Sequence, residues 1–397
     1  MKRFAVFNPE HDLALANGDA HYLAPRNIRE MAHDLAPLMD YLAWDTPWGW
    51  DAAIVNYLHK SGIPRQELPN DAMLAALRTR SERITAHHLL QQMLPLSVHL
   101  TGESYVCRSL DDIKTYATQH SHLLLKAPLS GSGKGLRHLN FNDDDNKNDN
   151  ENYPTNRRST SALTSTFKKI ERWADALIRR HGYLTAEPYY DKVQDFAMEF
   201  IVADGQCHFI GYSLFTTDDH GRYDSNLLLS DADIEARLSN YIPRSVLHDV
   251  RHFVEGHTGL IVPAEWDTSR FPITFGIDMM IVNIIGQQSI RPDGNSQLRI
   301  QNSEFKLHPC VEINLRANMG IIAHEVRHHL MAPEATGIYR LTLFADHAAL
   351  AAFDEEQRAL YPALYRNGLL VRGYHPLTST EGNARHLAYV IGGITQL

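Results

Sequence analysis

The sequence has few cysteines, no long apolar run and no excess of basic residues. Its three cysteines (Cys107, Cys207 and Cys310) lie far apart in 397 residues, which excludes a disulfide framework and predicts reduced thiols. No apolar stretch reaches the roughly 18 residues of a membrane helix, and the apolar run before Glu10 is too short for a signal peptide. With 47 acidic and 38 basic residues, a net charge of −9, the chain lacks the basic surface of a nucleic-acid-binding protein. We therefore expect a cytoplasmic globular protein with no nucleic-acid or membrane partner.

The first hundred residues predict a small α/β domain. Short apolar runs suggest strands at 4–7 and 52–55, and helical spacing of apolar residues predicts helices at 27–42 and 72–94, the latter broken near Arg80. A polar group, Asn8 to Asp12, follows the first predicted strand. It would line a binding cleft or form a capped turn, and the usual habits of these residues favour the turn.

The remaining residues alternate strands and helices. Residues 141–161 contain almost nothing apolar and are expected to be a disordered insertion. The predicted strands are 105–107, 123–125, 183–190 (which runs into a turn), 195–202, 207–211, 212–215, 274–282, 308–316, 339–343, 369–372 and 388–391. The predicted helices are 110–119, 166–181, 238–256 and 320–330, with another between the strands at 339–343 and 369–372.

A glycine-rich loop follows the apolar strand that ends at Lys126. Glycines allow the backbone to fold closely over a ligand and to aim its N–H groups at it, and neighbouring hydroxyls and lysines suit phosphate oxygens. The loop consists of Ser130, Gly131, Ser132, Gly133, Lys134 and Gly135. Pro128 and Gly135 occupy positions that exclude a Walker A loop. On this stretch alone, a surface turn is as good an interpretation as a phosphate cradle.

Oxygen ligands of the kind that magnesium prefers lie on two strands. Asp278 interrupts an apolar strand, and Glu312 and Asn314 alternate on the next strand, so they share one face. If these strands form a hairpin, the three side chains converge and would hold Mg²⁺ bridging nucleotide phosphates. Arg316 lies on the same face and could hold a phosphoryl oxygen. A solvated strand face would explain Glu312 and Arg316, but it explains a buried Asp278 poorly.

These motifs, in this order, resemble the ATP-grasp superfamily over residues 80–330, in the form found in carboxylate–amine ligases. The resemblance implies an α/β fold with α+β lobes. Its parts would be an N-terminal small α/β (pre-ATP-grasp) domain at 1–100, a small lobe at 101–185 with the loop and the insertion, and a large lobe at 186–397 with the metal site and a C-terminal extension.

The resemblance also implies ligands and roles for individual residues. ATP and Mg²⁺ (or Mn²⁺) would be the cofactors. Lys126 and the loop would bind phosphates, Arg83 would replace a missing lysine, and Asp195 would bind the ribose. The residues of the hinge that binds adenine would be Glu187, Tyr189 and Tyr190. Asp278, Glu312 and Asn314 would be the metal ligands, and Arg316 and Lys126 would be catalytic.

The implied reaction is ATP-dependent ligation through an acyl phosphate. A small-molecule or peptide carboxylate would attack the γ-phosphate, and an amine would displace phosphate, with ADP as the other product. A homodimer is possible. A small-molecule kinase of the same fold remains an alternative. So does a zinc hydrolase, because the segment His324-Glu325-Val326-Arg327-His328 fits H-E-x-x-H. A non-catalytic nucleotide-binding protein is disfavoured because it would have lost at least one of these ligands.

Overall fold

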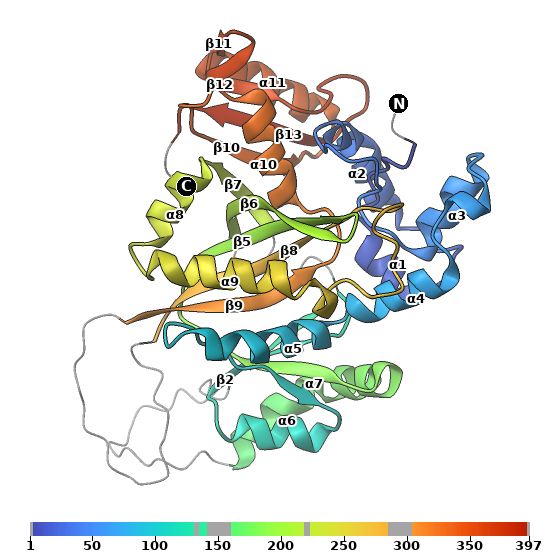
Figure 1. Ribbon diagram of the computed structural model, residues 1–397, viewed down its shortest axis with the longest axis vertical. Helices are drawn as coiled ribbons and strands as arrows, with labels where there is room; N and C mark the ends of the chain where they lie inside the picture. Colours follow the sequence, from blue (N-terminus) through green and yellow to red (C-terminus); the bar gives the residue numbers. More distant parts are fainter. Residues whose placement is uncertain (1–2, 131–134, 141–159, 218–222, 285–303, 395–397) are drawn as a thin grey trace.

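The structure is a computed structural model that describes residues 3–130, 135–140, 160–217, 223–284 and 304–394. Two sheets organise these residues (Figure 1). Helices and sheets are mixed, as the sequence predicted, and every strand pair described within the sheets is antiparallel. No helix in the described ranges is long and apolar enough to cross a membrane.

The smaller sheet has the strand order β1-β4-β2-β3. Its strands are β1 (Tyr105–Cys107), β4 (Leu184–Pro188), β2 (His122–Lys126) and β3 (Leu136–Asn140). Helices α6 (Leu110–Ala117) and α7 (Thr160–His181) pack on it around a core that includes Leu125, Leu139 and Phe167. The predicted strands and helices of this part are confirmed. The residues of the expected insertion before 160, and Gly131 to Lys134 of the loop, lie outside the described residues.

The larger sheet has nine strands in the order β11-β12-β13-β10-β7-β6-β5-β8-β9. Its central strands are β5 (Lys192–Ala203), β6 (Gln206–Thr217), β8 (Ile273–Asn283) and β9 (Phe305–Asn314). Asp204 and Gly205, both at positive φ, make the tight turn between β5 and β6. The remaining strands are β7 (Tyr223–Leu228), β10 (Gly337–Leu343), β11 (Leu364–Arg366), β12 (Leu369–Pro376) and β13 (His386–Gly392).

Helices cover this sheet on both sides. Helix α9 (Arg244–Gly256) and α8 (Asp231–Leu238) pack against β6, and so does α10 (Met319–Leu330). Helix α11 (His347–Leu360) packs on β12. The helix predicted at 238–256 starts only at Arg244, after Pro243, whose ring fixes its own φ and disfavours helical geometry in the residue before it.

The N-terminal hundred residues are helical where they are regular. They form α1 (His11–Asn17), α2 (Arg26–Leu35), α3 (Ala52–Lys60), α4 (Asp71–Arg80) and α5 (Arg83–Met93), with short 3₁₀ turns at Ala36–Asp40, Arg65–Glu67 and Leu94–Leu96. The two predicted helices are confirmed, although Pro37 changes the end of the first to a 3₁₀ turn. Both predicted strands are wrong.

The two failures have separate physical causes. The run at 52–55 begins helix α3, because the Asp51 carboxylate accepts a hydrogen bond from the Ile54 N–H and caps it. The run at 4–7 stays irregular. Its first N–H groups, of Arg3 and Phe4, donate to the Asp45 carboxylate instead of to a strand partner. Its aromatic rings still pack in the interior, Phe7 edge-on to Trp48.

Candidate active site

Strands β8 and β9 form the hairpin that the sequence predicted. Asp278 lies directly opposite Glu312, and Gly276 lies opposite Asn314. The Asn314 side-chain amide donates a 3.1 Å hydrogen bond to the Asp278 carboxylate. The structure therefore brings the three predicted metal ligands together, because antiparallel register puts opposed residues of adjacent strands within side-chain reach.

The electrostatics of the hairpin fit a cation. Burial, together with the negative charges of Glu312 and Glu199, raises the pKa of Asp278 well above its usual range. Two carboxylates opposed in a partly enclosed site repel each other, and a divalent ion between them would remove that repulsion. In the described ranges, no group of three or more His, Cys, Asp or Glu side chains is arranged so that it could hold a metal ion by itself. The Asn314 amide and substrate oxygens would therefore complete a magnesium site here.

A second buried carboxylate, Glu199 on β5, lies close to the hairpin and was missed by sequence reasoning. Ser213 Oγ and the Asn318 side-chain amide donate to it over 2.8 and 2.7 Å. Burial raises its pKa to about 7. A Cβ on Gly276 or Gly320 would lie within 2.4 Å of its oxygens, so both glycines make room for it. The signal was present, since Glu199 interrupts an apolar strand as Asp278 does.

Lys126 reaches from the smaller sheet to the larger one. Its ammonium lies 2.5 Å from the Glu187 carboxylate on β4 and 3.3 Å from the Val311 carbonyl oxygen on β9. Lys126 and Glu187 are both buried. The predicted strand lysine therefore faces the hairpin from across the two sheets, with Glu187 as its counter-ion.

Arg83 opens α5 and connects the loop to the hairpin. Its guanidinium donates to the Ala127 carbonyl at 3.0 Å, lies 3.4 Å from Ser130 Oγ and lies 3.0 Å from the Glu312 carboxylate. The Arg83 N–H donates to the Pro128 carbonyl. A Cβ on Gly135 would lie 2.3 Å from Ser130, so glycine is needed where the loop closes on itself.

The other predicted nucleotide residues are held by local contacts. Tyr189 is half exposed and stacks on His122, with ring centroids 4.2 Å apart. Tyr190 is buried, and its hydroxyl accepts a bond from the Glu103 N–H. Asp195 pairs with Lys192. Burial raises the pKa of Asp195, and the nearby Lys192 lowers it only in part, so that the net shift is upward. Their adenine and ribose roles stay predictions.

Arg316 connects the end of the hairpin to the N-terminal region. Its Nε and Nη2 donate to the two oxygens of Asp12 on α1, over 3.1 and 2.8 Å. Nη2 also donates to Asn314 Oδ1 at 3.1 Å. Burial would raise the pKa of Asp12, but Arg316 outweighs it and lowers the pKa. The segment 8–12 therefore contains the predicted turn and also brings Asp12 to the site, which the favoured interpretation missed.

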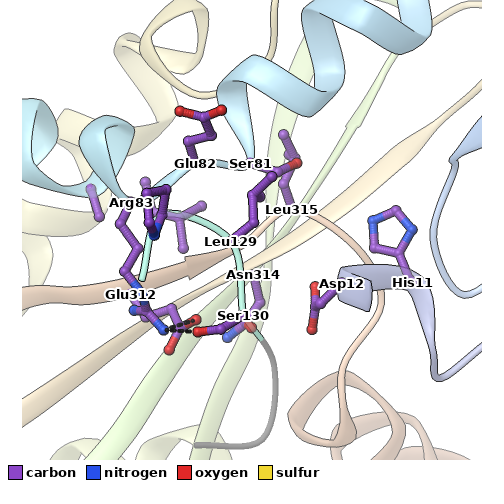
Figure 2. Close-up of a pocket in the computed structure, with 13 residues that line it drawn as sticks. His11, Asp12, Ser81, Glu82, Arg83, Leu129, Ser130, Glu312, Asn314 and Leu315 are labelled. Carbon is purple, nitrogen blue, oxygen red and sulfur yellow. Dashed lines mark hydrogen bonds and ion pairs between the residues drawn. The ribbon is translucent and has the colours of Figure 1, made fainter. Parts of the chain in front are cut away.

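These residues enclose a cavity between α1, the start of α5, the loop after β2 and the end of β9 (Figure 2). Asp12 and His11 lie on one side of it and Glu312 on the other, with Asn314 and Ser130 between them in this view. The lining residues are His11, Asp12, Ser81, Glu82, Arg83, Ala86, Pro128, Leu129, Ser130, Glu312, Ile313, Asn314 and Leu315. His11 and Glu82, like Asp12, were not predicted site residues.

The H-E-x-x-H segment on α10 is arranged differently from a zinc site. His324 lies 3.6 Å from Asp231 and 3.8 Å from Glu325, and these carboxylates raise its pKa to about 9 although burial lowers it. His328 is exposed, and Glu325 pairs with His329 instead. A protonated His324 is a poor metal ligand, so the arrangement does not favour the zinc hydrolase.

Comparisons with known proteins give only distant matches. No protein-family model matches the sequence, and no curated protein matches it. The fold is similar to the N5-carboxyaminoimidazole synthetase from Staphylococcus aureus, at 12% identity over 79% of this chain and 67% of that one, with a TM-score of 0.39.

Two further solved structures are similar, with comparably low sequence identity and TM-score. N5-carboxyaminoimidazole synthase from Aspergillus clavatus, in complex with ADP and 5-aminoimidazole ribonucleotide, is 11% identical over 88% of this chain and 77% of that one, with a TM-score of 0.44. A biotin carboxylase–ATP complex from Campylobacter jejuni is 12% identical over 92% and 74%, with a TM-score of 0.45. Such matches transfer no activity, so the function has to be argued from the site residues.

Proposed function

We propose that this protein is an ATP-dependent ligase of the ATP-grasp type, which joins a carboxylate to an amine and releases ADP and phosphate. The observation that carries the proposal is the β8–β9 hairpin. It sets Asp278 opposite Glu312, with Asn314 and Arg316 beside them, and faces Lys126 from the smaller sheet. Carboxylates, an amide and two cations at one place are the groups that phosphoryl transfer needs.

In this proposal the nucleotide phosphates lie between the smaller sheet and the hairpin. Lys126, Arg83 and the Ser130 hydroxyl bind phosphate oxygens, and Glu187 to Tyr190 and Asp195 contact adenine and ribose. Lys126 and Arg83 each have a carboxylate partner, Glu187 and Glu312. Phosphate oxygens would therefore compete with these carboxylates for the same two cations.

Asp278, Glu312 and Asn314 would hold Mg²⁺ or Mn²⁺. The residues fit such an ion, because Asp278 and Glu312 are hard oxygen donors that repel each other. When bound, the ion would neutralise charge on the transferred phosphoryl group.

In this proposal, Arg316 contacts the transferred phosphoryl group from the side of Asp12. Its guanidinium is fixed by both oxygens of Asp12 and by Asn314, so it is oriented before the substrate binds. In that position it stabilises the negative charge of the acyl phosphate. Small molecules or peptides would be the substrates, and the proposal places the protein in the cytoplasm.

Thermal denaturation with ATP, ADP or adenosine, each with and without Mg²⁺, tests the proposal first. A ligand at a hundred times its Kd raises the stability of the folded state by about 2.7 kcal/mol. We expect a magnesium-dependent shift with ATP and ADP and a smaller one with adenosine. Asp278→Asn is the matched variant and should lose the magnesium dependence. No shift with any nucleotide would contradict the proposal.

Product analysis then separates ligase from kinase. Carboxylates and amines are screened in pairs for ADP release. A ligase yields free phosphate in equal amount to ADP, whereas a kinase yields a phosphorylated acceptor and no free phosphate. A phosphorylated acceptor that survives in the products would replace the ligase with the kinase.

A further inference from the structure

The cavity contains an imidazole, that of His11, which the nucleotide chemistry does not use. His11 Nδ1 lies 2.9 Å from Asp51 Oδ2, and both side chains are almost fully buried, with 1% and 2% exposed. Asp51 also accepts hydrogen bonds from the Asn8 amide and from the Ile54 N–H. A carboxylate that acts as an acceptor in this way accepts a hydrogen bond from Nδ1–H, and in that tautomer of the neutral ring Nε2 keeps a free lone pair.

That free nitrogen has no hydrogen-bond partner within the described part of the chain. His11 Nε2 is buried, and His11 lines the cavity with Asp12, Glu312 and Asn314. A buried polar atom without a partner destabilises the folded protein. The ring is also fixed in place, because a Cβ on Gly49 would lie 2.4 Å from its Cγ. An oriented and unpartnered nitrogen in a cavity indicates a ligand that donates a proton.

The charges that line the cavity indicate the chemistry of that ligand. Among the described residues, the carboxylates of Asp12, Glu82 and Glu312 line the cavity, whereas the cations beside them are Arg83, which pairs with Glu312, and Arg316, which pairs with Asp12, so that three carboxylates face two cations. An amine, which is cationic in water and carries N–H donors, matches both this charge and the free lone pair of Nε2. A carboxylate would be repelled.

We propose that the end of the cavity formed by His11 and Asp12 is the amine subsite, and that His11 is the base of the ligation. This inference rests on the proposed function. The bound ammonium first gives one proton to His11 Nε2, which frees the lone pair of its nitrogen, and Asp51 stabilises the imidazolium that results. The nitrogen then forms a bond to the acyl carbon. The bond from that carbon to phosphate breaks, and phosphate leaves with the electron pair and takes up the second proton that the nitrogen loses.

The first test observes the ring directly and needs no carboxylate substrate. The protein is labelled with ¹⁵N-histidine, and His11→Asn identifies the His11 signals by subtraction. We expect an Nδ1-protonated ring with an unprotonated Nε2, whose shift moves on addition of methylammonium. Tetramethylammonium, which has the same charge but no N–H, should not move it. A protonated Nε2, or equal shifts with both ions, would overturn the proposal.

The second test separates the two halves of the reaction. Asn at position 11 keeps a donor for Asp51 but has no basic nitrogen in the place of Nε2. Hydroxylamine is largely unprotonated at neutral pH and needs no base, so it reports acyl phosphate as a hydroxamate. In His11→Asn we expect amide formation to fall at least about 100-fold more than hydroxamate formation. His33→Asn, on the exposed face of α2, is the matched control. Gly49→Ala should reproduce the loss by displacing the ring.

The outcomes distinguish this inference from the proposed function. Equal loss of amide and hydroxamate in His11→Asn would make His11 structural and leave the ligase intact. A wild-type protein that shows no magnesium-dependent nucleotide shift, but does show the methylammonium response of Nε2, would remove the ligase and leave the amine site.

Discussion

The acidic groups of the site, which are buried or partly buried, fall into two sets that differ in their partners. The paired carboxylates, Asp12, Glu187 and Glu312, each contact a lysine or arginine on another element. The unpaired carboxylates, Glu199 and Asp278, lie on the adjacent strands β5 and β8 and have no cation within ion-pair distance in the described part of the chain. Instead they accept hydrogen bonds from neutral amides and a hydroxyl.

The difference shows in the pKa values. Arg316 lowers the pKa of Asp12 despite burial. Burial raises the pKa of Glu199 to about 7 and that of Asp278 well above its usual range. Folding therefore makes the ionised forms of Glu199 and Asp278 costly at the hairpin, although three cations lie nearby. Such an arrangement favours the binding of a divalent cation, because the bound ion stabilises the ionised carboxylates.

The largest effect is expected from the hairpin ligands. Glu312→Ala and Asn314→Ala, and also Asp278→Asn, should lower magnesium-dependent ATP turnover by about a thousandfold, or about 4 kcal/mol, because each removes an oxygen donor to the ion. Asp278→Asn should at the same time raise the free energy of unfolding, since it removes a costly buried charge. Turnover and urea denaturation measure the two effects. Glu334→Gln, on the surface, is the control, and wild-type turnover in the three variants would exclude the metal assignment.

Breaking a paired carboxylate should have the opposite effect on stability. Lys126→Met leaves Glu187 buried and uncompensated, which is expected to cost about 3–5 kcal/mol in urea denaturation. The double variant Lys126→Met/Glu187→Gln should recover most of that loss. Calorimetry should show weaker ATP binding in Lys126→Met and little change for adenosine. A similar loss of adenosine binding would show that the role of Lys126 is not to bind phosphate.

The sequence predicted those parts of the fold and the site whose signal lies within a few neighbouring residues. The hairpin was predicted correctly, because a lone carboxylate in an apolar strand and two alternating polar residues on the next strand are visible within a few positions. Glu199 gives the same local signal and was overlooked. The strand predicted at 52–55 was wrong because a four-residue apolar run is compatible with a strand and with a helix. Only Asp51, which precedes the run and caps the helix, indicated a helix.

The N-terminal side of the site was not accessible to local reasoning. Asp12 and Arg316 are 304 positions apart in the sequence, and His11 and Asp51 are 40 positions apart. Each is an ordinary polar residue in its own segment. Only packing of α1 against the end of β9 gives them a shared cavity, and no periodicity or spacing encodes that contact.

Glu199 gives a smaller, pH-dependent effect. Its pKa is raised from 4.5 to about 7 in the folded protein, so the folded state holds the proton more tightly than the unfolded state. Its contribution to stability therefore falls as pH rises from about 4.5 to about 7, by up to about 3 kcal/mol. Glu199→Gln should stabilise the protein relative to wild type more at pH 8 than at pH 5, in urea denaturation at both values. Ser239→Ala, at the end of α8, should show no such dependence. Equal effects of Glu199→Gln at both pH values would contradict the assignment.

The smallest effect concerns the pair between Arg316 and Asp12. A double-mutant cycle with Arg316→Lys and Asp12→Asn should give a coupling of about 1–2 kcal/mol, because the pair is bidentate and mostly enclosed. Since the pKa of Asp12 is lowered, this coupling should be present at neutral pH and lost as pH falls below its usual range.

The exposed pair of Arg26 and Glu30 on α2 is the control for that cycle, with an expected coupling of about 0.3–0.5 kcal/mol. Equal couplings would mean that enclosure adds nothing at Arg316, and the N-terminal region would then be a neighbour of the hairpin only. A larger coupling for Arg316, accompanied by loss of turnover in Asp12→Asn, would mean that the N-terminal region orients the arginine that the chemistry uses. The paired carboxylates would then serve to position cations, whereas the unpaired ones attract them.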